Sequence, residues 1–238
     1  MIRTIIWFIY FFAYLLVATP LWLYCNHKIK KGERAQVQPK IEKMVYNWAN
    51  RLIKLAGGEI EVVGQENIPE GTAVFVSNHQ SDFDIPTVLT VTGKPRALMA
   101  KKSLAKIPGI HGWMNHLQCV FLDRDNEVEA VQALREAIRL VKNGNSITIF
   151  PEGTRSKGGP VKEFKGGAFR IATSTKTPIV PITIDGTYRM LEQPGYIHPA
   201  KVKVTIHKPI ETAGMSRQEV RDLPERVRQQ VMSALPEA

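Results

Sequence analysis

The sequence predicts an α/β domain with a mostly parallel central sheet flanked by helices, preceded by an N-terminal membrane-associated helical arm. Three observations support this prediction. Short apolar segments typical of strands alternate with longer segments of helical periodicity from residue 59 onward. Residues 4–26 contain no charged side chain. The 238 residues, 44% of them hydrophobic, suffice for one ordinary domain with a buried core.

The uncharged run at residues 4–26 is rich in aromatic and aliphatic side chains. As a helix, residues 5–24 would reach about 30 Å, the thickness of a bilayer's hydrocarbon core. A cleaved signal peptide is disfavoured because the run is long, lacks a small-x-small cleavage site, and is followed by Lys28, Lys30 and Lys31. This excess of positive charge predicts that the main body lies on the cytoplasmic face of the cell membrane. Pro20 could bend the helix, and the sequence leaves a full span and embedding in one leaflet equally open.

A second helix is expected at residues 39–56, where Ile41, Val45, Trp48 and Leu52 recur at helical spacing and Gly57 follows. It either packs on the domain or lies against the bilayer as a basic amphipathic helix. We therefore expect membrane-anchoring helices in residues 1–57 and the α/β domain in residues 58–238.

Within that domain, the alternation of patterns predicts both strands and helices. Strands are expected at residues 60–63, 72–77, 96–100, 118–122, 146–150, 179–184 and 202–207, and helices at 127–141 and 164–174. A capping-box pattern at Ser216 and Glu219 begins a last helix, in which Pro224 marks either a fresh start or a kink. The helix at 127–141 has an apolar stripe made of Val128, Val131, Leu134, Ile138 and Val141.

Two polar motifs each follow a predicted strand. The first is Asn78-His79-Gln80-Ser81-Asp82-Phe83-Asp84, and the second is Phe150-Pro151-Glu152-Gly153-Thr154-Arg155-Ser156. In a parallel sheet the carboxyl ends of the strands meet at one edge, which is where ligands bind. We therefore expect the two motifs to form one site.

The first motif pairs an imidazole with a carboxylate. Histidine is the natural general base near neutral pH, and Asp84 on one ring nitrogen of His79 would fix the tautomer and stabilise the imidazolium. The sequence contains no G-x-S-x-G nucleophile motif. Direct attack by a substrate hydroxyl, deprotonated by His79, is therefore the simpler chemistry.

The second motif has the composition of an anion-binding turn. Gly153 permits close approach of the backbone to a ligand, and Arg155 can bind a phosphate with two donors. Glu152 either orients Arg155 or binds ligand hydroxyls. Arg124 follows another predicted strand, and Lys101, Lys102 and Arg170 are further candidates for a positive pocket.

The composition restricts the partners less than the motifs do. The formal charge of +10 favours nucleic acid, anionic lipid headgroups or a phosphorylated metabolite. No metal site is expected, because Cys25 and Cys119 have no metal-ligand spacing, and the absence of Walker and Rossmann glycine motifs argues against ATP and nicotinamide cofactors.

The motifs carry a resemblance to a known family. Asn78 to Asp84, Phe121 to Arg124, Phe150 to Ser156 and Val180-Pro181-Ile182 resemble the four ordered sequence blocks of the glycerolipid acyltransferases. The resemblance covers residues 72–184, and Glu152 to Arg155 is more similar to the lysophosphatidate branch than to the branch that acylates glycerol 3-phosphate. It implies transfer of a fatty acyl group from acyl-CoA or acyl-carrier protein to the 2-hydroxyl of lysophosphatidate, in phospholipid biosynthesis, without a metal or organic cofactor.

The resemblance also implies roles for single residues. His79 would be the base and Asp84 its partner, while Arg124, Glu152 and Arg155 would form the phosphate pocket. Lys102, Gly153 and Thr154 complete the expected substrate-binding set.

Two alternatives remain open. One is acylation of another lysophospholipid or of glycerol 3-phosphate. The other is a non-catalytic, membrane-tethered module that binds anionic lipid. Nucleic acid is not expected as a partner, because no nucleic-acid-binding motif or aromatic–basic interleaving is present.

Overall fold

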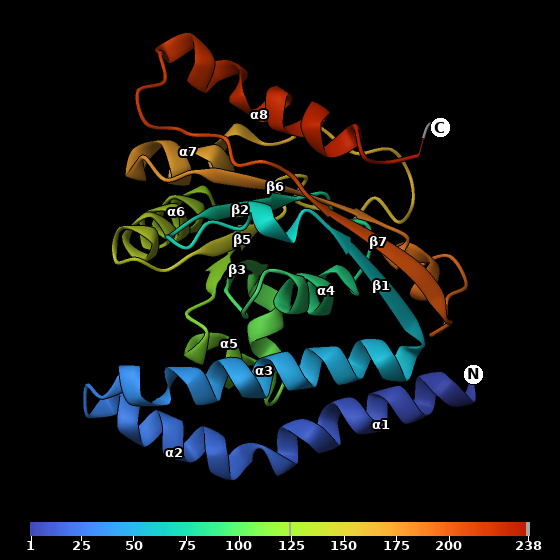
Figure 1. The fold of residues 1–238 in the computed structure, drawn as a ribbon. Helices are drawn as coiled ribbons and strands as arrows, with labels where there is room; N and C mark the ends of the chain where they lie inside the picture. The colour runs from blue at the N-terminus through green and yellow to red at the C-terminus, as the bar shows by residue number, and fades with distance from the viewer. Residues whose placement is uncertain (124, 237–238) are drawn as a thin grey trace.

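The computed structural model describes residues 1–123 and 125–236, and its centre is a seven-stranded sheet (Figure 1). The strands are β1 (Gly58–Val63), β2 (Val74–Ser77), β3 (Ala97–Lys101), β4 (Val120–Leu122), β5 (Ile147–Ile149), β6 (Ile179–Asp185) and β7 (Ala200–Ile206). Their order is β1-β7-β6-β2-β5-β3-β4, and each neighbouring pair is parallel except β6 and β7. The predicted mostly parallel sheet is confirmed.

Helices cover both faces of the sheet, which explains why the central strands are apolar throughout. One face of the sheet lies toward the N-terminal arm, which consists of α1 (Ile2–Val17) and α2 (Thr19–Lys30), and this face carries α3 (Arg34–Ala56), α4 (Asp84–Val91) and α5 (Ile110–His116) (Figure 1). The other face carries α6 (Glu127–Lys142), α7 (Gly166–Thr175) and α8 (Arg217–Met232). Short 3₁₀ turns are η1 (Gln65–Asn67), η2 (Lys102–Lys106) and η3 (Thr187–Met190). Every residue of β2 and of β5 is buried, as a sheet covered on both faces requires. Two hydrophobic clusters result, one on each face.

Local signals in the sequence set several helix ends. Gly57, at φ +80°, ends α3 in the left-handed conformation. The side chain of Asn126 accepts the backbone N–H groups of Val128 and Glu129 at the start of α6. The capping box of Ser216 and Glu219 forms at the start of α8. Pro224 lies inside α8, which continues to Met232.

The N-terminal run forms two helices where the sequence pattern suggests one. Helix α1 (Ile2–Val17) and helix α2 (Thr19–Lys30) meet at Ala18 and are bent by 45°. Pro20 lies in the first turn of α2, where its missing N–H has no intrahelical partner to lose. Within residues 1–123 and 125–236, no single helix is long and apolar enough to cross a membrane, although α1 and α2 together have the length and composition.

Helix α3 packs on the domain, which decides between the two alternatives for this segment. Val37, Ile41, Val45 and Leu52 are buried in the same hydrophobic cluster as residues of the sheet and of α4. The helix begins at Arg34, five residues before the expected start, and Pro39 is accommodated inside it.

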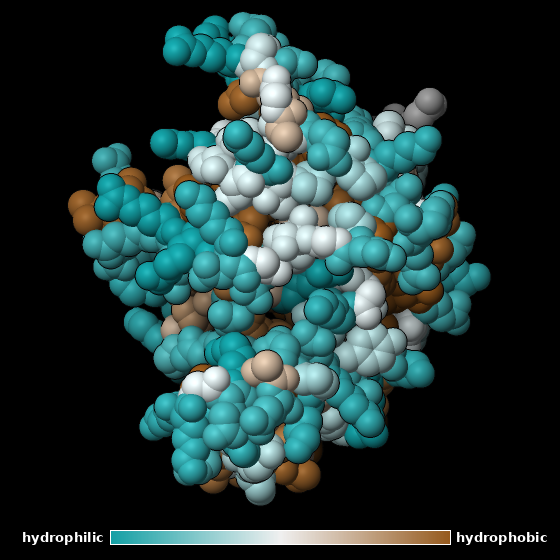
Figure 2. All heavy atoms as spheres, turned by 60° about the vertical axis from the view of Figure 1, so that its left-hand side comes forward, coloured by the Kyte–Doolittle hydropathy of each residue, from teal (hydrophilic) through white to brown (hydrophobic). Residues whose placement is uncertain are grey.

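Helix α1 lies along α3 and leaves an apolar face uncovered. Trp7 is buried and its Nε1 donates to the Leu52 carbonyl at 2.9 Å, while the opposite face of α1 exposes large apolar side chains. These are Ile2, Ile5, Ile6, Phe8, Ile9, Phe12, Leu16 and Val17. In Figure 2 hydrophobic residues show at the lower edge of a mainly hydrophilic surface, where Figure 1 places α1 and α2.

Candidate active site

The first motif occupies the turn between the end of β2 and the start of α4. Asn78, the first residue after β2, is buried, and its side chain forms two hydrogen bonds of 2.8 Å with the backbone of Ile184 in neighbouring β6. The turn is thereby attached to the carboxyl-terminal edge of the sheet. Asp84 is the first residue of α4, so the histidine and the aspartate of the motif approach each other across this turn.

The His79 imidazole is hydrogen-bonded to a fully buried carboxylate. Nδ1 lies 2.7 Å from Oδ2 of Asp84, which also accepts the N–H groups of Gln80 at 2.6 Å and Ser81 at 2.9 Å. The other oxygen of Asp84 accepts the hydroxyl of Thr187 at 2.5 Å. Four donors compensate the burial of the charge. Because a carboxylate only accepts, Nδ1 of His79 carries the proton.

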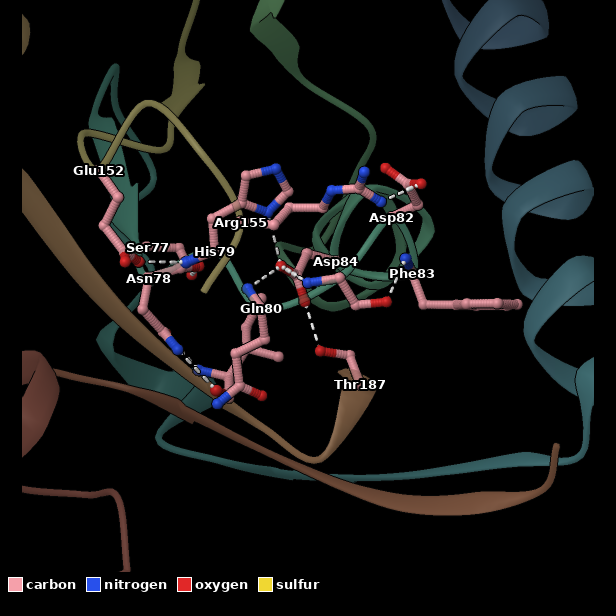
Figure 3. Close-up of polar contacts among 12 residues, drawn as sticks. Ser77, Asn78, His79, Gln80, Asp82, Phe83, Asp84, Glu152, Arg155 and Thr187 are labelled. Atoms are coloured by element: carbon pink, nitrogen blue, oxygen red, sulfur yellow. Dashed lines mark hydrogen bonds and ion pairs between the residues drawn. The ribbon is translucent and has the colours of Figure 1, made fainter. Parts of the chain in front are cut away.

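The second ring nitrogen of His79 faces away from Asp84 (Figure 3). The side chain is 14% exposed and its ring stacks on Phe150 with centroids 4.4 Å apart. With Nδ1 protonated, Nε2 of the neutral ring has a free lone pair. The ring therefore presents a base to the space beside Phe150.

The second motif is joined to the first by backbone hydrogen bonds. The N–H of Ser156 donates to the His79 carbonyl at 2.7 Å, and that of Lys157 donates to the Gln80 carbonyl at 3.1 Å. The two motifs thus lie in one place, as their positions after parallel strands predict.

Glu152 strengthens this junction from inside the protein. One carboxylate oxygen accepts the N–H of His79 at 2.6 Å and the other accepts the N–H of Lys162 at 2.9 Å. Burial raises the pKa of the Glu152 carboxyl, an effect that the two N–H donors oppose. The idea that Glu152 orients Arg155 is wrong, because both of its oxygens bind backbone amides.

Arg155 is held by two other carboxylates. Its Nη1 forms ion pairs with Asp82 and, at 3.0 Å, with Glu192 (Figure 3 shows the pair with Asp82). The Glu192 side chain is nearly buried, whereas that of Asp82 is exposed. Arg155 itself is one third exposed.

The two motifs border a cleft of about 930 Å³. Its lining includes His79, Gly153, Thr154, Arg155, Lys101 and Lys102. Lys102 forms ion pairs with Glu129 and, at 3.5 Å, with Asp123. Lys101, Lys106 and Lys157 also line the cleft, and no carboxylate of the described residues lies within ion-pair distance of them. Asp82, Asp123 and Asp125 line the cleft as well, so its described lining has five cationic and three anionic side chains and an excess of positive charge.

The remaining sequence candidates lie elsewhere. Arg124 falls outside the described residues. Arg170 is exposed on α7 and does not line the cleft. Thr187 and Glu192 come from the segment after β6, and no motif in the sequence predicts that they belong to the site. Over the described part of the chain, no group of three His, Cys, Asp or Glu side chains could hold a metal ion.

An apolar cavity of about 320 Å³ adjoins the cleft on the arm side. Trp7 and Phe11 of α1 line one wall of it. Ile85, Ala100 and Leu104 line both this cavity and the cleft, so the two spaces are neighbours.

Comparison with known proteins places this arrangement in a family. A family model described as Acyltransferase matches residues 59–185, more than half of the chain. The chain belongs to the acyltransferase family. The matched range contains both motifs and the strands that precede them, and the predicted family resemblance is confirmed.

Individual members of the acyltransferase family resemble the chain over different lengths. It is 42% identical over 155 residues to the chloroplastic 1-acyl-sn-glycerol-3-phosphate acyltransferase of Brassica napus, which covers 63% of this chain but 44% of that relative. It is 33% identical over 184 residues to the enzyme of the same name from Haemophilus influenzae, 76% of this chain and 75% of that one. The chain thus spans less than half the length of the plant relative.

A solved structure matches the whole acyltransferase chain. It is the crystal structure of the 1-acyl-sn-glycerophosphate (LPA) acyltransferase PlsC from Thermotoga maritima, with a TM-score of 0.76 and 30% identity over 99% of both chains. The likeness therefore extends to the arm as well as to the α/β domain.

Proposed function

We propose that this protein transfers a fatty acyl group from an acyl thioester to the sn-2 hydroxyl of lysophosphatidic acid, giving phosphatidic acid. The observation that carries the proposal is the His79 imidazole, which is backed by buried Asp84 and borders the same cleft as the cationic turn around Arg155. The relatives are named 1-acyl-sn-glycerol-3-phosphate acyltransferase or 1-acyl-sn-glycerophosphate (LPA) acyltransferase, and these names support acyl transfer to this acceptor.

In the proposed reaction, Nε2 of His79 accepts the proton of the acceptor hydroxyl as that oxygen attacks the thioester carbonyl carbon. A C–O bond forms, and the tetrahedral intermediate collapses with breakage of the C–S bond. The imidazolium then returns the proton to the departing thiolate, so atoms and charges balance without a cofactor. Asp84 stabilises the imidazolium and holds the ring in its orientation.

We assign the acceptor's phosphate to the cationic wall of the cleft. Among the described residues, Lys101 and Lys157 form no ion pair, and both line the cleft together with Lys102. For Arg155 to bind phosphate, the exposed Asp82 would give way, while the nearly buried Glu192 keeps the guanidinium in place.

The remaining residues of the expected substrate-binding set have different positions relative to the cleft. Gly153 and Thr154 line the same wall of the cleft. Glu152 supports the turn from behind and does not line the cleft. The assignment of Arg124 to the phosphate stays a prediction.

We also infer that residues 1–57 attach residues 58–238 to the cytoplasmic face of the cell membrane through α1 and α2. The support is the uncovered apolar face of α1 together with the lysines that follow α2. A lipid acceptor could then reach the cleft from the arm side, along the apolar cavity lined by Trp7 and Phe11.

The direct test is release of free thiol from palmitoyl-CoA by the purified full-length protein in lipid vesicles, with and without lysophosphatidic acid. We expect release that requires the acceptor and forms phosphatidic acid. Glycerol 3-phosphate, a second lysophospholipid and acyl-carrier protein thioesters, tested in the same assay, identify the preferred acceptor and donor.

Two variants test the assigned roles. His79→Ala should lower kcat by about 10²–10⁴-fold while folding and vesicle binding persist. Arg155→Ala should chiefly raise KM for the acceptor. Near-normal turnover of the His79 variant would refute the mechanism, and an effect of the Arg155 variant confined to the thioester would refute the phosphate role.

A further inference from the structure

Asp82 lies directly beside the guanidinium that we assign to the acceptor's phosphate. Its carboxylate forms an ion pair with Nη1 of Arg155, and Figure 3 shows the guanidinium directed toward it. Both residues line the cleft. A carboxylate of the chain itself therefore binds Arg155 at the place where a phosphate oxygen would bind.

The two carboxylates that hold Arg155 differ in how firmly they are fixed. The Glu192 side chain is 4% exposed, and besides Arg155 its Oε1 accepts the backbone N–H of Asp82 at 2.9 Å. The Asp82 side chain is 64% exposed, and over the described part of the chain its carboxylate has no hydrogen bond other than that to Arg155. Glu192 is thus a fixed support, whereas the Asp82 side chain can turn into solvent when another anion takes its place.

The proposed reaction leaves the phosphate of the acceptor unchanged, and this inference rests on that proposed function. Phosphatidic acid carries the same phosphate as lysophosphatidic acid and one more hydrocarbon chain. A cleft that binds the phosphate and both chains would therefore hold the product more tightly than the acceptor. A contact made equally with substrate and transition state lowers KM without raising kcat. Weakening the phosphate contact throughout the reaction costs no chemical rate and favours release of the product.

We propose that Asp82 is an internal competitor for Arg155, which the phosphate of lysophosphatidic acid displaces and which returns to Arg155 as phosphatidic acid leaves. The carboxylate is tethered three residues after His79, so its effective concentration at Arg155 is high at all times. After displacement it stays near the bound phosphate and repels it. Asp82 therefore raises both the KM of the acceptor and the inhibition constant of the product.

Two exposed aspartates of the cleft allow a matched test. Asp82→Asn removes the charge and keeps the size of the side chain, as well as the backbone N–H that donates to Glu192. Asp125 also lines the cleft and is exposed, and within the described residues it forms no ion pair. Asp125→Asn therefore removes the same charge from the same cleft without removing a contact to Arg155.

The first experiment measures inhibition of the full-length protein by dioctanoyl phosphatidic acid, with palmitoyl-CoA saturating and lysophosphatidic acid varied. Asp82→Asn should lower the KM of the acceptor and the inhibition constant of the product, each by about three- to fivefold, and should not raise kcat. Asp125→Asn should change both constants by less than about 1.5-fold, because solvent and salt screen its charge. An unchanged inhibition constant in Asp82→Asn, or an equal change in Asp125→Asn, overturns the proposal.

Two further comparisons show whether Asp82 acts on the phosphate and through Arg155. Dioctanoylglycerol has the chains of the inhibitor but no phosphate, so it should inhibit the wild-type protein and Asp82→Asn equally. In an Arg155→Gln background, Asp82→Asn should no longer change inhibition by dioctanoyl phosphatidic acid, because no guanidinium is left to release. If Asp82→Asn strengthens inhibition equally with and without Arg155, the carboxylate acts by general repulsion and the proposal is wrong.

A binding measurement separates this proposal from the proposed function. Calorimetric titration of His79→Ala protein with dioctanoyl phosphatidic acid requires no turnover, and adding Asp82→Asn should lower the dissociation constant by the same factor. If the wild-type protein acylates no lysophosphatidic acid yet this Arg155-dependent effect is found, the proposed function fails while this inference stands. If it acylates lysophosphatidic acid and Asp82→Asn leaves the dissociation constant unchanged, this inference alone fails.

Discussion

At the scale of single residues, the proposed chemistry depends on the hydrogen bonds that the buried carboxylate of Asp84 accepts. Its two oxygens accept four hydrogen bonds, three of them at Oδ2 and one from the Thr187 hydroxyl at Oδ1. An amide oxygen could take over the role of Oδ2, and the Thr187 hydroxyl could rotate to accept from the amide nitrogen. One substitution can therefore remove the negative charge at this position and keep its hydrogen bonds.

Asp84→Asn should keep the fold and lose activity. The hydrogen-bonded network persists with the Thr187 hydroxyl reversed, but the carboxylate that stabilises the imidazolium is gone. We expect kcat to fall about 100-fold or more with a small change in thermal unfolding. Thiol release and circular dichroism measure the two effects, and Thr187→Val, which replaces the hydroxyl by a methyl group and keeps the charge of Asp84, is the control. Wild-type turnover in Asp84→Asn would show that the charge has no catalytic part.

A second prediction at this scale concerns Glu152. Both carboxylate oxygens accept backbone N–H groups, from His79 and Lys162. Glu152→Gln has only one oxygen, so one buried N–H must face an amide donor. We expect a loss of about 1–3 kcal/mol in the free energy of unfolding, measured with urea. Glu163→Gln, an exposed neighbour, should unfold like wild type, and equal stability of the two variants would contradict the supporting role of Glu152.

The sequence alone predicts some of these residues as members of the site and does not predict others. The five-residue interval from His79 to Asp84 is visible as a local pattern, and both residues are predicted as a pair. Thr187 and Glu192 contact the site from a segment about a hundred residues later, and only the folding of β6 beside β2 brings them there. No local spacing encodes such a contact, so these partners were found only in the structure.

At the scale of elements, α2 and α5 approach each other closely at Gly112. A Cβ on Gly112 would lie 2.4 Å from Nε1 of Trp22, whose ring stacks on His116 with centroids 5.6 Å apart. Real Cβ atoms do not occur at such distances, so the indole would have to move. Gly112 thus permits the arm to lie against the domain at this point.

Gly112→Ala should weaken this contact. Helix propensity alone predicts that this substitution stabilises the protein by up to about 1 kcal/mol. The sign of the change in the free energy of unfolding therefore distinguishes helix propensity from overpacking. We expect destabilisation of about 1–3 kcal/mol from overpacking, with faster tryptic cleavage after Lys30 and Lys31. Gly71→Ala is the control, because its Cβ would have no atom within 4 Å. A more stable Gly112→Ala protein would refute the close packing.

The strands and the long periodic helices are predictable from the sequence, whereas the short helices are not. The strands and the helices α3, α6, α7 and α8 follow from the apolar periodicity, with ends that differ by a few residues. The sequence pattern does not predict helix α4, because its eight residues contain a proline and several β-branched side chains, a composition that does not favour a helix by itself. Packing against α3 supplies the stabilisation that the helix propensity of its own residues does not give.

At the scale of the whole molecule, the parallel sheet explains why distant motifs meet and why the arm side differs from the other side. Strands β2 and β5 are parallel neighbours, so the residues that follow them emerge at one edge. One face of the sheet continues through α3 into the arm, while α8 covers the other face (Figure 1). The cleft at this edge therefore lies between the face that leads to the exposed apolar side chains of α1 and the face that α8 covers.

This division predicts how the proposed membrane attachment can be removed without loss of the fold. Ile5, Ile9 and Leu16 are 59%, 64% and 74% exposed on α1, and each would gain about 1.5–3 kcal/mol on full burial in a bilayer. Replacing all three with serine should lower partitioning into vesicles of phosphatidylglycerol and phosphatidylcholine by at least about a hundredfold. Co-sedimentation with the vesicles measures the change.

The control is the double variant Val63→Ser and Met232→Ser, which removes exposed apolar side chains from β1 and α8. It should partition like wild type, because neither residue belongs to the arm. The triple variant should also keep its unfolding midpoint and its activity on detergent-dispersed acceptor, since the three side chains are not in the core. If it instead bound vesicles as tightly as the wild-type protein, these three exposed side chains would contribute nothing to attachment, and the inferred role of the apolar face of α1 would be wrong.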